Sequence, residues 1–326
     1  MVMNFTFFGR NASANQVECS TPTWGYDISA VQVLGYCLTI IPLVNISVNV
    51  ITMAYIIRAP KLKANTRVFL CSLTVSNTLV GVFVLPVRIF GMITATVGIS
   101  LEISYILCVV GNSFDVMLRT SSALHLSVLA YDRYLSTCRP FSRGYRLNRK
   151  FNTILFIGCW TVPAILSFGV IPPRFQLKGI VKEYNCLLNR TKMCQYITNM
   201  PYAFITTFAC FIVPAAFILM CNNRTISSVK KREKVFIKLL HINTKRRSFN
   251  RRHFGTKLSR TILSMSCIFL CCWLPFFVIN FTDPLTSYRV PVYIWLLVSW
   301  VGYANSVITS VIYLKSTKVL FFSCND

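Results

Sequence analysis

The amino-acid sequence predicts an all-α membrane protein, a single domain built as a bundle of seven transmembrane helices. The chain of 326 residues is 54% hydrophobic and only 13% charged, and its mean hydropathy is +0.57, which is outside the usual range of soluble domains. Apolar stretches also recur along the chain at the length that crosses a bilayer, about 20 residues in a helix. Such stretches must be helical, because lipid cannot hydrogen-bond an open backbone.

Seven stretches reach this length, and no repeat, low-complexity run or soluble domain separates them. They are 31–57, 68–93, 105–137, 151–171, 198–221, 257–281 and 292–314. We therefore expect an N-terminal segment over 1–30, a helical domain over 31–314 and a short tail over 315–326.

The Lys and Arg residues gather in the first, third and fifth loops, and the fifth is the most basic, with Glu233 as its only acid. Basic loops stay in the cytosol, so we expect the N-terminus outside and the C-terminus cytosolic. The net charge of +25 is then mainly a signal of topology. It favours contact with anionic membrane lipid and gives little support to nucleic-acid binding.

Glycosylation acceptors agree with this orientation. The triplets that begin at Asn4, Asn11 and Asn189 all fall on the predicted outer side. The triplet at Asn45 lies inside a predicted span, where we expect it to be unused. The first ten residues have no apolar core of a signal peptide, so the first span is expected to direct insertion.

The third span ends in Asp132-Arg133-Tyr134 and turns into basic sequence. A charged pair at the end of a spanning helix costs little when it sits at the water boundary. Arg133 can pair with Asp132 or reach toward another helix, which would make it a two-position switch. A solvated helix end explains the tripeptide equally well.

Together these features resemble the rhodopsin-like G-protein-coupled receptors, and within that class the trace-amine-associated receptors. The resemblance runs from Asn49 to Tyr313. It rests on Asn49, Cys108, the Asp132-Arg133-Tyr134 triplet, Trp160, Pro214, Phe269, the run Cys272-Trp273-Leu274-Pro275-Phe276-Phe277, Asp283-Pro284, and Trp300-Val301-Gly302-Tyr303-Ala304-Asn305-Ser306. It implies a multi-pass receptor of the plasma membrane, not an enzyme. The expected partners are a small-molecule ligand, an amine by preference, a heterotrimeric G protein and membrane lipid, with no cofactor and no metal.

Four of the cysteines fall on the predicted outer side, where disulfides form, and seven lie in spans, where a thiol packs as a small apolar group. The outer four are Cys19, Cys108, Cys186 and Cys194, which allow three connectivities. The resemblance implies the pairs Cys108–Cys194 and Cys19–Cys186, although the segment between Cys186 and Cys194 is longer here than in the family.

An acid inside a span is expensive and points to a functional site. Asp115 lies seven residues after Cys108, where amine receptors of this family place the carboxylate that pairs with the ligand's ammonium by a charge-assisted hydrogen bond. The resemblance adds aromatic walls that attract a cation and hydroxyls from the fifth span. These candidates are Trp273, Phe276, Phe277, Tyr303, Thr206 and Thr207. For any single ring, ordinary packing is the alternative.

Arg119 complicates this site. It lies four positions after Asp115 and on the same helix face, so its guanidinium can fold back onto the carboxylate in a bidentate pair. Arg88 adds a second cation near the outer end of its span. One interpretation is a structural ion pair. The other is a site for a zwitterionic or anionic ligand, with Asp115 as one partner.

The residues that the family uses for activation also depart from its pattern. Asn77 stands where the second span usually has Asp, and Asn222 replaces a tyrosine near the inner end of the fifth. The Asn-Pro-x-x-Tyr motif reads Thr309-Ser310-Val311-Ile312-Tyr313, so its proline is absent while Tyr313 remains. We expect a straighter seventh helix and coupling that is weak, basally biased or lost.

The tail offers an amphipathic helical turn or two at the membrane over 315–322, with Cys324 as a palmitoylation candidate. A transporter would show an inverted repeat with broken helices, which is not visible. An intramembrane enzyme would need a catalytic group, and His125 has no placed Cys or carboxylate partner. We expect His125 to be a hydrogen-bonded core residue.

Overall fold

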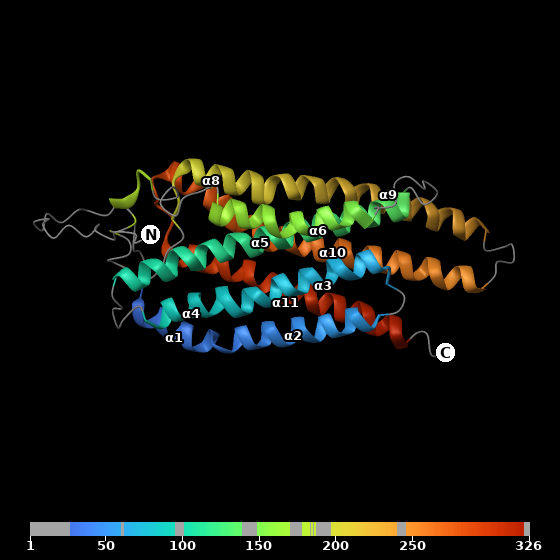
Figure 1. The fold of residues 1–326 in the computed structure, drawn as a ribbon, viewed down its shortest axis with the longest axis horizontal. Coiled ribbons are helices and arrows are strands. Elements are labelled where there is room, and N and C mark those ends of the chain that lie inside the picture. The colour runs from blue at the N-terminus through green and yellow to red at the C-terminus, as the bar shows by residue number, and fades with distance from the viewer. Residues whose placement is uncertain are drawn as a thin grey trace, which may run out of the picture.

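The computed structural model describes residues 27–59, 62–94, 101–138, 149–169, 178–182, 184, 186, 197–239 and 246–322. Over these ranges the regular structure is helical, and long rods lie side by side in an elongated bundle (Figure 1). The acceptors Asn4, Asn11 and Asn189 and the cysteines Cys19 and Cys194 fall outside the described residues, so the predictions made for them stay predictions.

Within the described residues, helical segments occupy the main part of each of the seven predicted stretches. The first four rods are α1 (Ile28–Leu38) with α2 (Ile40–Arg58); α3 (Ala64–Leu79), the π-helical turn η1 (Val80–Val84) and α4 (Leu85–Ile93); α5 (Leu101–Cys138); and α6 (Arg149–Ala164) with the π-helical turn η3 (Ile165–Gly169). The last three are α8 (Met200–Thr207), η5 (Phe208–Ile212) and α9 (Val213–Leu239); α10 (Arg246–Thr282); and α11 (Val292–Phe322), with the 3-10 turn η6 (Pro284–Thr286) before it. The predicted seven-helix bundle is confirmed.

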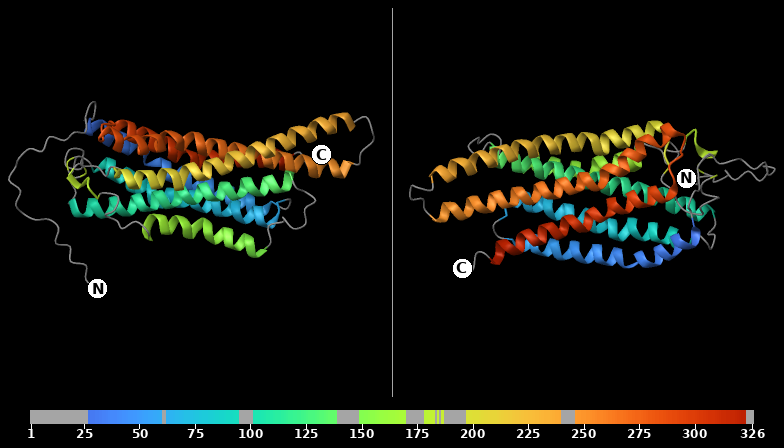
Figure 2. Two further views of the ribbon diagram at one scale, coloured as in Figure 1. Left: turned by 90° about the horizontal axis from the view of Figure 1, so that it is seen from above. Right: turned by 180° about the vertical axis from the view of Figure 1, so that it is seen from behind.

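We call the end at which α1, α5, α8 and α11 begin the amino-terminal end, and the other the basic end. Figure 2 shows that α9 and α10 run past the other rods at the basic end. The rod of α5 packs against α3, α4, α6, α9 and α10, so it is the central helix of the bundle.

Prolines explain most of the interruptions that hydropathy did not predict. A proline has no N–H and its ring excludes the carbonyl four residues earlier. The first rod breaks at Thr39, three residues before Pro42, and the backbone N–H and hydroxyl of Thr39 both turn to the carbonyl of Tyr36, at 3.3 and 2.7 Å. The π-helical turns η1 and η5 each end two residues before a proline, Pro86 and Pro214.

Six rods are long and apolar enough to span a membrane: 29–58, 64–93, 150–168, 200–231, 256–286 and 292–316. The rod α5 is the seventh by length, but Asp115, Arg119 and His125 in its middle lower its hydropathy. Its neighbours bury these side chains at 0–3% exposure, so they face protein and not lipid.

Large apolar side chains cover the outside of the bundle. Leu43 and Ile154 are 65% exposed, and Leu297 is 62% exposed. An apolar surface of this extent would promote association in water, whereas it matches the hydrocarbon of a bilayer.

The predicted division of the cysteines is confirmed for those that are described. Free thiols are Cys37, Cys71, Cys138, Cys159, Cys210, Cys221, Cys267, Cys271 and Cys272, which include all seven that were placed in spans. Cys186 forms a disulfide bond. Its partner is not among the cysteines whose side chains the structure describes. The two pairings stay predictions.

The seventh rod is uninterrupted. Lacking a proline, α11 continues as one α-helix from Val292 to Phe322. The residues of the expected amphipathic turns, 315–322, extend this rod and do not begin a separate helix in the described chain.

Candidate functional site

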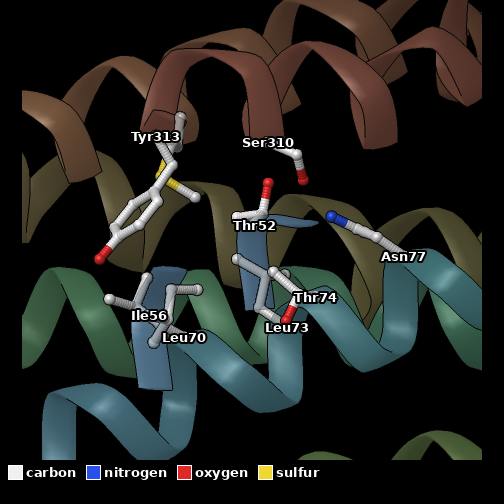
Figure 3. A pocket seen from close by; sticks show the side chains of 9 residues that line it. Thr52, Ile56, Leu70, Leu73, Thr74, Asn77, Ser310 and Tyr313 are labelled. Atoms are coloured by element: carbon white, nitrogen blue, oxygen red, sulfur yellow. The ribbon is translucent and has the colours of Figure 1, made fainter. Parts of the chain in front are cut away.

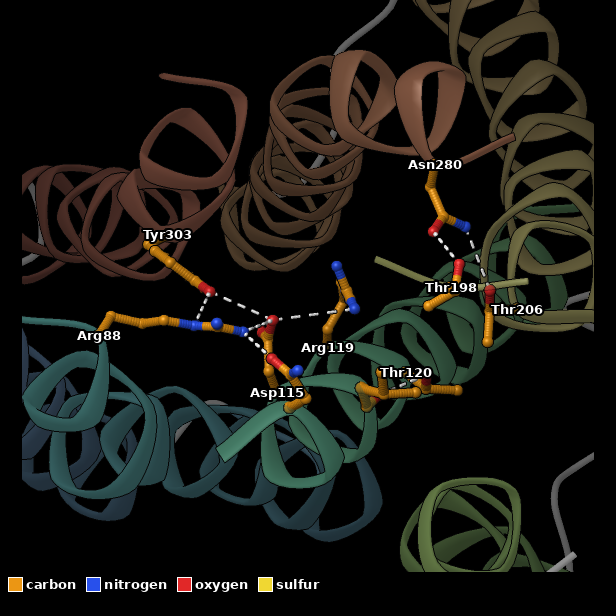
Figure 4. A network of polar contacts seen from close by, with 10 residues as sticks. Arg88, Asp115, Arg119, Thr120, Thr198, Thr206, Asn280 and Tyr303 are labelled. Carbon is orange, nitrogen blue, oxygen red and sulfur yellow. Dashed lines mark hydrogen bonds and ion pairs between the residues drawn. The ribbon is translucent and has the colours of Figure 1, made fainter. Parts of the chain in front are cut away.

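A buried charge cluster lies in the amino-terminal half of the bundle, where α4, α5 and α11 meet (Figure 4). We define it as Arg88, Asn112, Asp115, Arg119 and Tyr303. The Asp115 carboxylate is 2% exposed, and its Oδ2 accepts hydrogen bonds from the Tyr303 hydroxyl at 3.1 Å and from Nη2 of Arg88 at 3.3 Å. Within the described chain no donor reaches its Oδ1.

Arg88 is the nearest cation to Asp115. Its Nε donates to the Tyr303 hydroxyl at 3.2 Å, and its Nη2 also donates to Oδ1 of Asn112 at 2.5 Å. The Arg88 side chain keeps 17% of its surface exposed, against 3% for Asp115. Sequence reasoning noted Arg88 as an intramembrane cation but did not assign it to the site, and it missed Asn112. The signal was available, since Asn112 lies three positions before Asp115 and so shares its helix face.

Arg119 faces aromatic rings more closely than it faces Asp115. Its Nη2 is 3.9 Å from Oδ2 of Asp115, so the two residues form an ion pair, but not with the bidentate geometry that their spacing allowed. The Arg119 Cζ lies 4.3 Å from the ring centroid of Phe276, 4.8 Å from that of Trp273 and 5.2 Å from that of Phe277. Rings shielded from water hold a guanidinium well, so they draw it away from the carboxylate.

We call the rings of Trp273, Phe276 and Phe277 the aromatic cage. The ring centroids of Trp273 and Phe276 are 5.7 Å apart, and those of Phe276 and Phe277 are 5.5 Å apart, both edge to face. Gly302 lets α11 approach closely, since a Cβ there would lie 2.7 Å from Cζ3 of Trp273. The cage is therefore a packed unit that already encloses a cation of the protein.

The two threonines predicted for the site lie in a separate polar cluster. Nδ2 of Asn280 donates to the hydroxyls of Thr206 at 3.2 Å and Thr207 at 3.0 Å, and Thr198 donates to Oδ1 of Asn280 at 3.4 Å. Figure 4 shows this cluster apart from Asp115. Sequence reasoning missed Asn280, although an amide inside an apolar span is itself a signal.

At the basic end, Arg133 is in the clamped arrangement that was one of its two expected positions. Nη2 of Arg133 pairs with Oδ2 of Asp132 and donates to the Thr66 hydroxyl at 2.9 Å. Thr66 also donates to Asp132 at 2.8 Å, which ties α3 to α5. The ring of Tyr134 lies 6.3 Å from that of Tyr131.

A small internal space separates this end from the charge cluster. It is bounded by α2, α3, α10 and α11, with Thr52, Asn77, Ser310 and Tyr313 in its wall (Figure 3). Oδ1 of Asn77 accepts from Ser122 at 3.3 Å. The lining side chains are neutral.

His125 is a core residue, as expected. One ring nitrogen is 2.7 Å from the Ser121 carbonyl and the other is 2.7 Å from the Ser72 hydroxyl, which also accepts from Trp160 at 2.9 Å. These contacts tie α5, α3 and α6 together, so the histidine supports packing.

Comparison with known proteins shows what this architecture is similar to. Residues 48–313 match the 7 transmembrane receptor (rhodopsin family). The chain is 29% identical to 5-hydroxytryptamine receptor 4 of Cavia porcellus, over 85% of this chain and 76% of the relative. It is 25% identical to trace amine-associated receptor 1 of Mus musculus, over 89% and 86% respectively. It is also 26% identical to trace amine-associated receptor 13c of Danio rerio, over 86% and 80%.

These matches confirm the resemblance inferred from the sequence motifs, and serotonin receptors stand beside the trace-amine receptors among the relatives. The family match covers most of the helical bundle, whose apolar surface and spanning rods make it a multi-pass protein of the plasma membrane. The chain belongs to the rhodopsin family of seven-transmembrane receptors.

Proposed function

We propose that this protein is a receptor for a small biogenic or trace amine and that it signals through a heterotrimeric G protein. The relatives are named for 5-hydroxytryptamine and for trace amines. Their family is one of receptors and not of enzymes, and this chain shares the family's helical frame.

One observation carries the choice of an amine. Asp115 is a buried carboxylate whose protein donors all approach Oδ2, so that Oδ1 stays open to a ligand within the described chain. An ammonium at Oδ1 would form a charge-assisted hydrogen bond in a poorly solvated place, where such bonds are strong. Tyr303 would hold the carboxylate in position from the opposite oxygen.

We further propose the orientation and the outer anchors. Residues 1–30 would form a glycosylated outer segment and 315–326 a cytosolic tail, with Asp132, Arg133 and Tyr134 facing the G protein. The disulfides Cys108–Cys194 and Cys19–Cys186 would hold the second outer loop, a proposal that the bonded state of Cys186 supports.

Asp115→Asn tests the function by removing the charge while keeping the shape of the side chain. Amine-stimulated nucleotide exchange on a G protein should need about a hundredfold more ligand or disappear, as expected when a buried charge pair loses one partner. Asp27→Asn is the matched control: Asp27 is an exposed carboxylate that caps α1 through Ser29 at 2.9 Å, and asparagine caps equally well. An unchanged amine response in Asp115→Asn would refute the anchor.

A second possibility is a receptor with impaired coupling. Asn77 is neutral and hydrogen-bonds to Ser122 and, at 3.5 Å, to Thr309, where the family has an acid and an asparagine. Nucleotide exchange measured without any ligand distinguishes a basally active receptor from a silent one.

A further inference from the structure

Among the described residues, the charge cluster contains two guanidiniums and one carboxylate. The guanidiniums of Arg88 and Arg119 lie 3.3 and 3.9 Å from one carboxylate, that of Asp115. The buried Asp283 nearer the amino-terminal end does not compensate them, because its oxygens accept from the backbone of Val290 at 3.0 Å and from Trp295 at 3.1 Å. A ligand with only an ammonium would add a second positive charge, and like charges repel strongly where water is scarce.

Oδ1 of Asp115 disfavours a ligand that has an acidic group but no ammonium. A ligand with only an acidic group would meet a carboxylate whose Oδ1 has no donor in the described chain. That oxygen favours a cation. The two requirements are met together by a ligand that carries an ammonium and an acidic group at once.

Arg88 is the cation that such an acidic group can reach. Its side chain keeps 17% of its surface exposed, whereas that of Arg119 keeps 2%. Its guanidinium already lies beside the Asp115 carboxylate (Figure 4). An arginine recognises a carboxylate through paired donors, so the two ends of the ligand would bind neighbouring groups of α4 and α5.

The aromatic cage restricts the remainder of the ligand. Its three rings surround the Arg119 guanidinium at 4.3–5.2 Å, so the place where an aryl group would stack is filled by the protein. We therefore expect the part of the ligand between its two charged ends to be a short aliphatic chain and not an aromatic ring.

We propose that the ligand is a small aliphatic zwitterion, with its ammonium on Oδ1 of Asp115 and its carboxylate on Arg88. This proposal rests on the proposed function of Asp115 as an ammonium anchor and narrows the class of amine. It makes Arg88 the residue that determines specificity for the acidic group.

Sets of compounds matched in chain length test the proposal on the full-length receptor in cell membranes. One set is γ-aminobutyrate, butylamine and butyrate, and a second is β-alanine, propylamine and propionate, with 2-phenylethylamine as the aryl amine. We expect one of the zwitterions to act at a concentration at least about tenfold lower than its matched amine and acid, as a hydrogen bond to a charged group implies.

Arg88→Gln tests the assigned residue. It should raise the concentration of zwitterion needed by about tenfold or more and leave the matched amine equally potent or more potent. The glutamine amide reaches about as far as Nε of Arg88, so it can still donate to Tyr303, and antibody staining of an epitope tag checks surface level. Arg289→Gln, which removes an exposed arginine at the amino-terminal end, is the matched control and should change neither response.

The outcomes separate this proposal from the one on which it rests. If the matched amine or 2-phenylethylamine is as potent as the zwitterion, the zwitterion proposal is wrong and the proposed amine receptor stands. The same holds if Arg88→Gln weakens the responses to zwitterion and amine equally. Activation by the acids alone, unaffected by Asp115→Asn, overturns both. If the receptor is present at the surface but responds to none of these compounds, the zwitterion proposal is wrong as well.

Discussion

Arg119 occupies the space that an aromatic ligand would need. Its guanidinium is enclosed by Trp273, Phe276 and Phe277, and its Nη2 lies 3.9 Å from Oδ2 of Asp115. The cation–π contacts are each worth about 0.5–2 kcal/mol, so together they hold the side chain as firmly as the ion pair does.

Arg119→Ser should therefore admit arylalkylamines. Asp115 keeps Arg88 and Tyr303 as partners, so its carboxylate stays compensated, and the vacated cage can take an aryl ring together with its ammonium. We expect 2-phenylethylamine to gain about tenfold or more in potency, and Asp115→Ala in the same background to remove the gain. Arg119→Met, which loses the charge but refills the cage, is the control and should gain much less. An unchanged potency in Arg119→Ser would show that the cage is structural only.

At the scale of the helices, α11 depends on a glycine to approach α10. A Cβ on Gly302 would lie 2.7, 2.8 and 2.9 Å from three ring atoms of Trp273, which is 5% exposed and packs edge to face on Tyr303 at 6.0 Å. The ring has no free direction in which to move, so α11 itself must shift.

Gly302→Ala should destabilise the bundle by about 1–3 kcal/mol, the usual cost of overpacking, and should lower the melting temperature of the detergent-solubilised receptor. Gly158→Ala in α6 is the control. Nothing lies within 4 Å of its added Cβ, and alanine favours a helix over glycine by about 1 kcal/mol, so its melting temperature should hold or rise. Equal melting temperatures for the two variants would contradict the close approach.

The spans could be predicted from the sequence because stretches of about 20 mostly apolar residues recur along it, the length that a helix needs to cross lipid. The interruptions could not, although Pro42, Pro86 and Pro214 were visible, because a lost hydrogen bond can end a helix or be absorbed by a π-helical turn, and tertiary packing decides which.

The contacts within the charge cluster could not be predicted from the sequence either. The spacing of Asp115 and Arg119 placed both on one helix face, but the direction of each guanidinium depends on other helices. Rings of α10 turn Arg119 away, and the position of α4 brings Arg88 closer. These contacts join residues far apart in the sequence, so no local pattern contains them.

At the scale of the whole molecule, the distribution of charge predicts which end faces the cytosol. The basic end carries Arg58, Lys63, Arg67, Lys230 and Lys231 on the described helices and their caps, and such residues resist translocation. We therefore expect the amino-terminal end to face outward together with the charge cluster, so that a ligand would reach Asp115 from outside the cell.

Glycan removal tests this orientation. Peptide-N-glycosidase should increase the electrophoretic mobility of the mature protein, because Asn4, Asn11 and Asn189 would all meet the glycosylation machinery on the outer side. Replacing the three with glutamine should abolish the shift. Ser47→Ala, which destroys the triplet at Asn45 without touching that residue, is the control: Asn45 is fully buried and donates to Ser306 at 2.9 Å, so the shift should not change. A shift that survives the triple replacement, or none from a protein at the surface, would contradict the assignment of the outer side and leave Asp115 without a route to an extracellular amine.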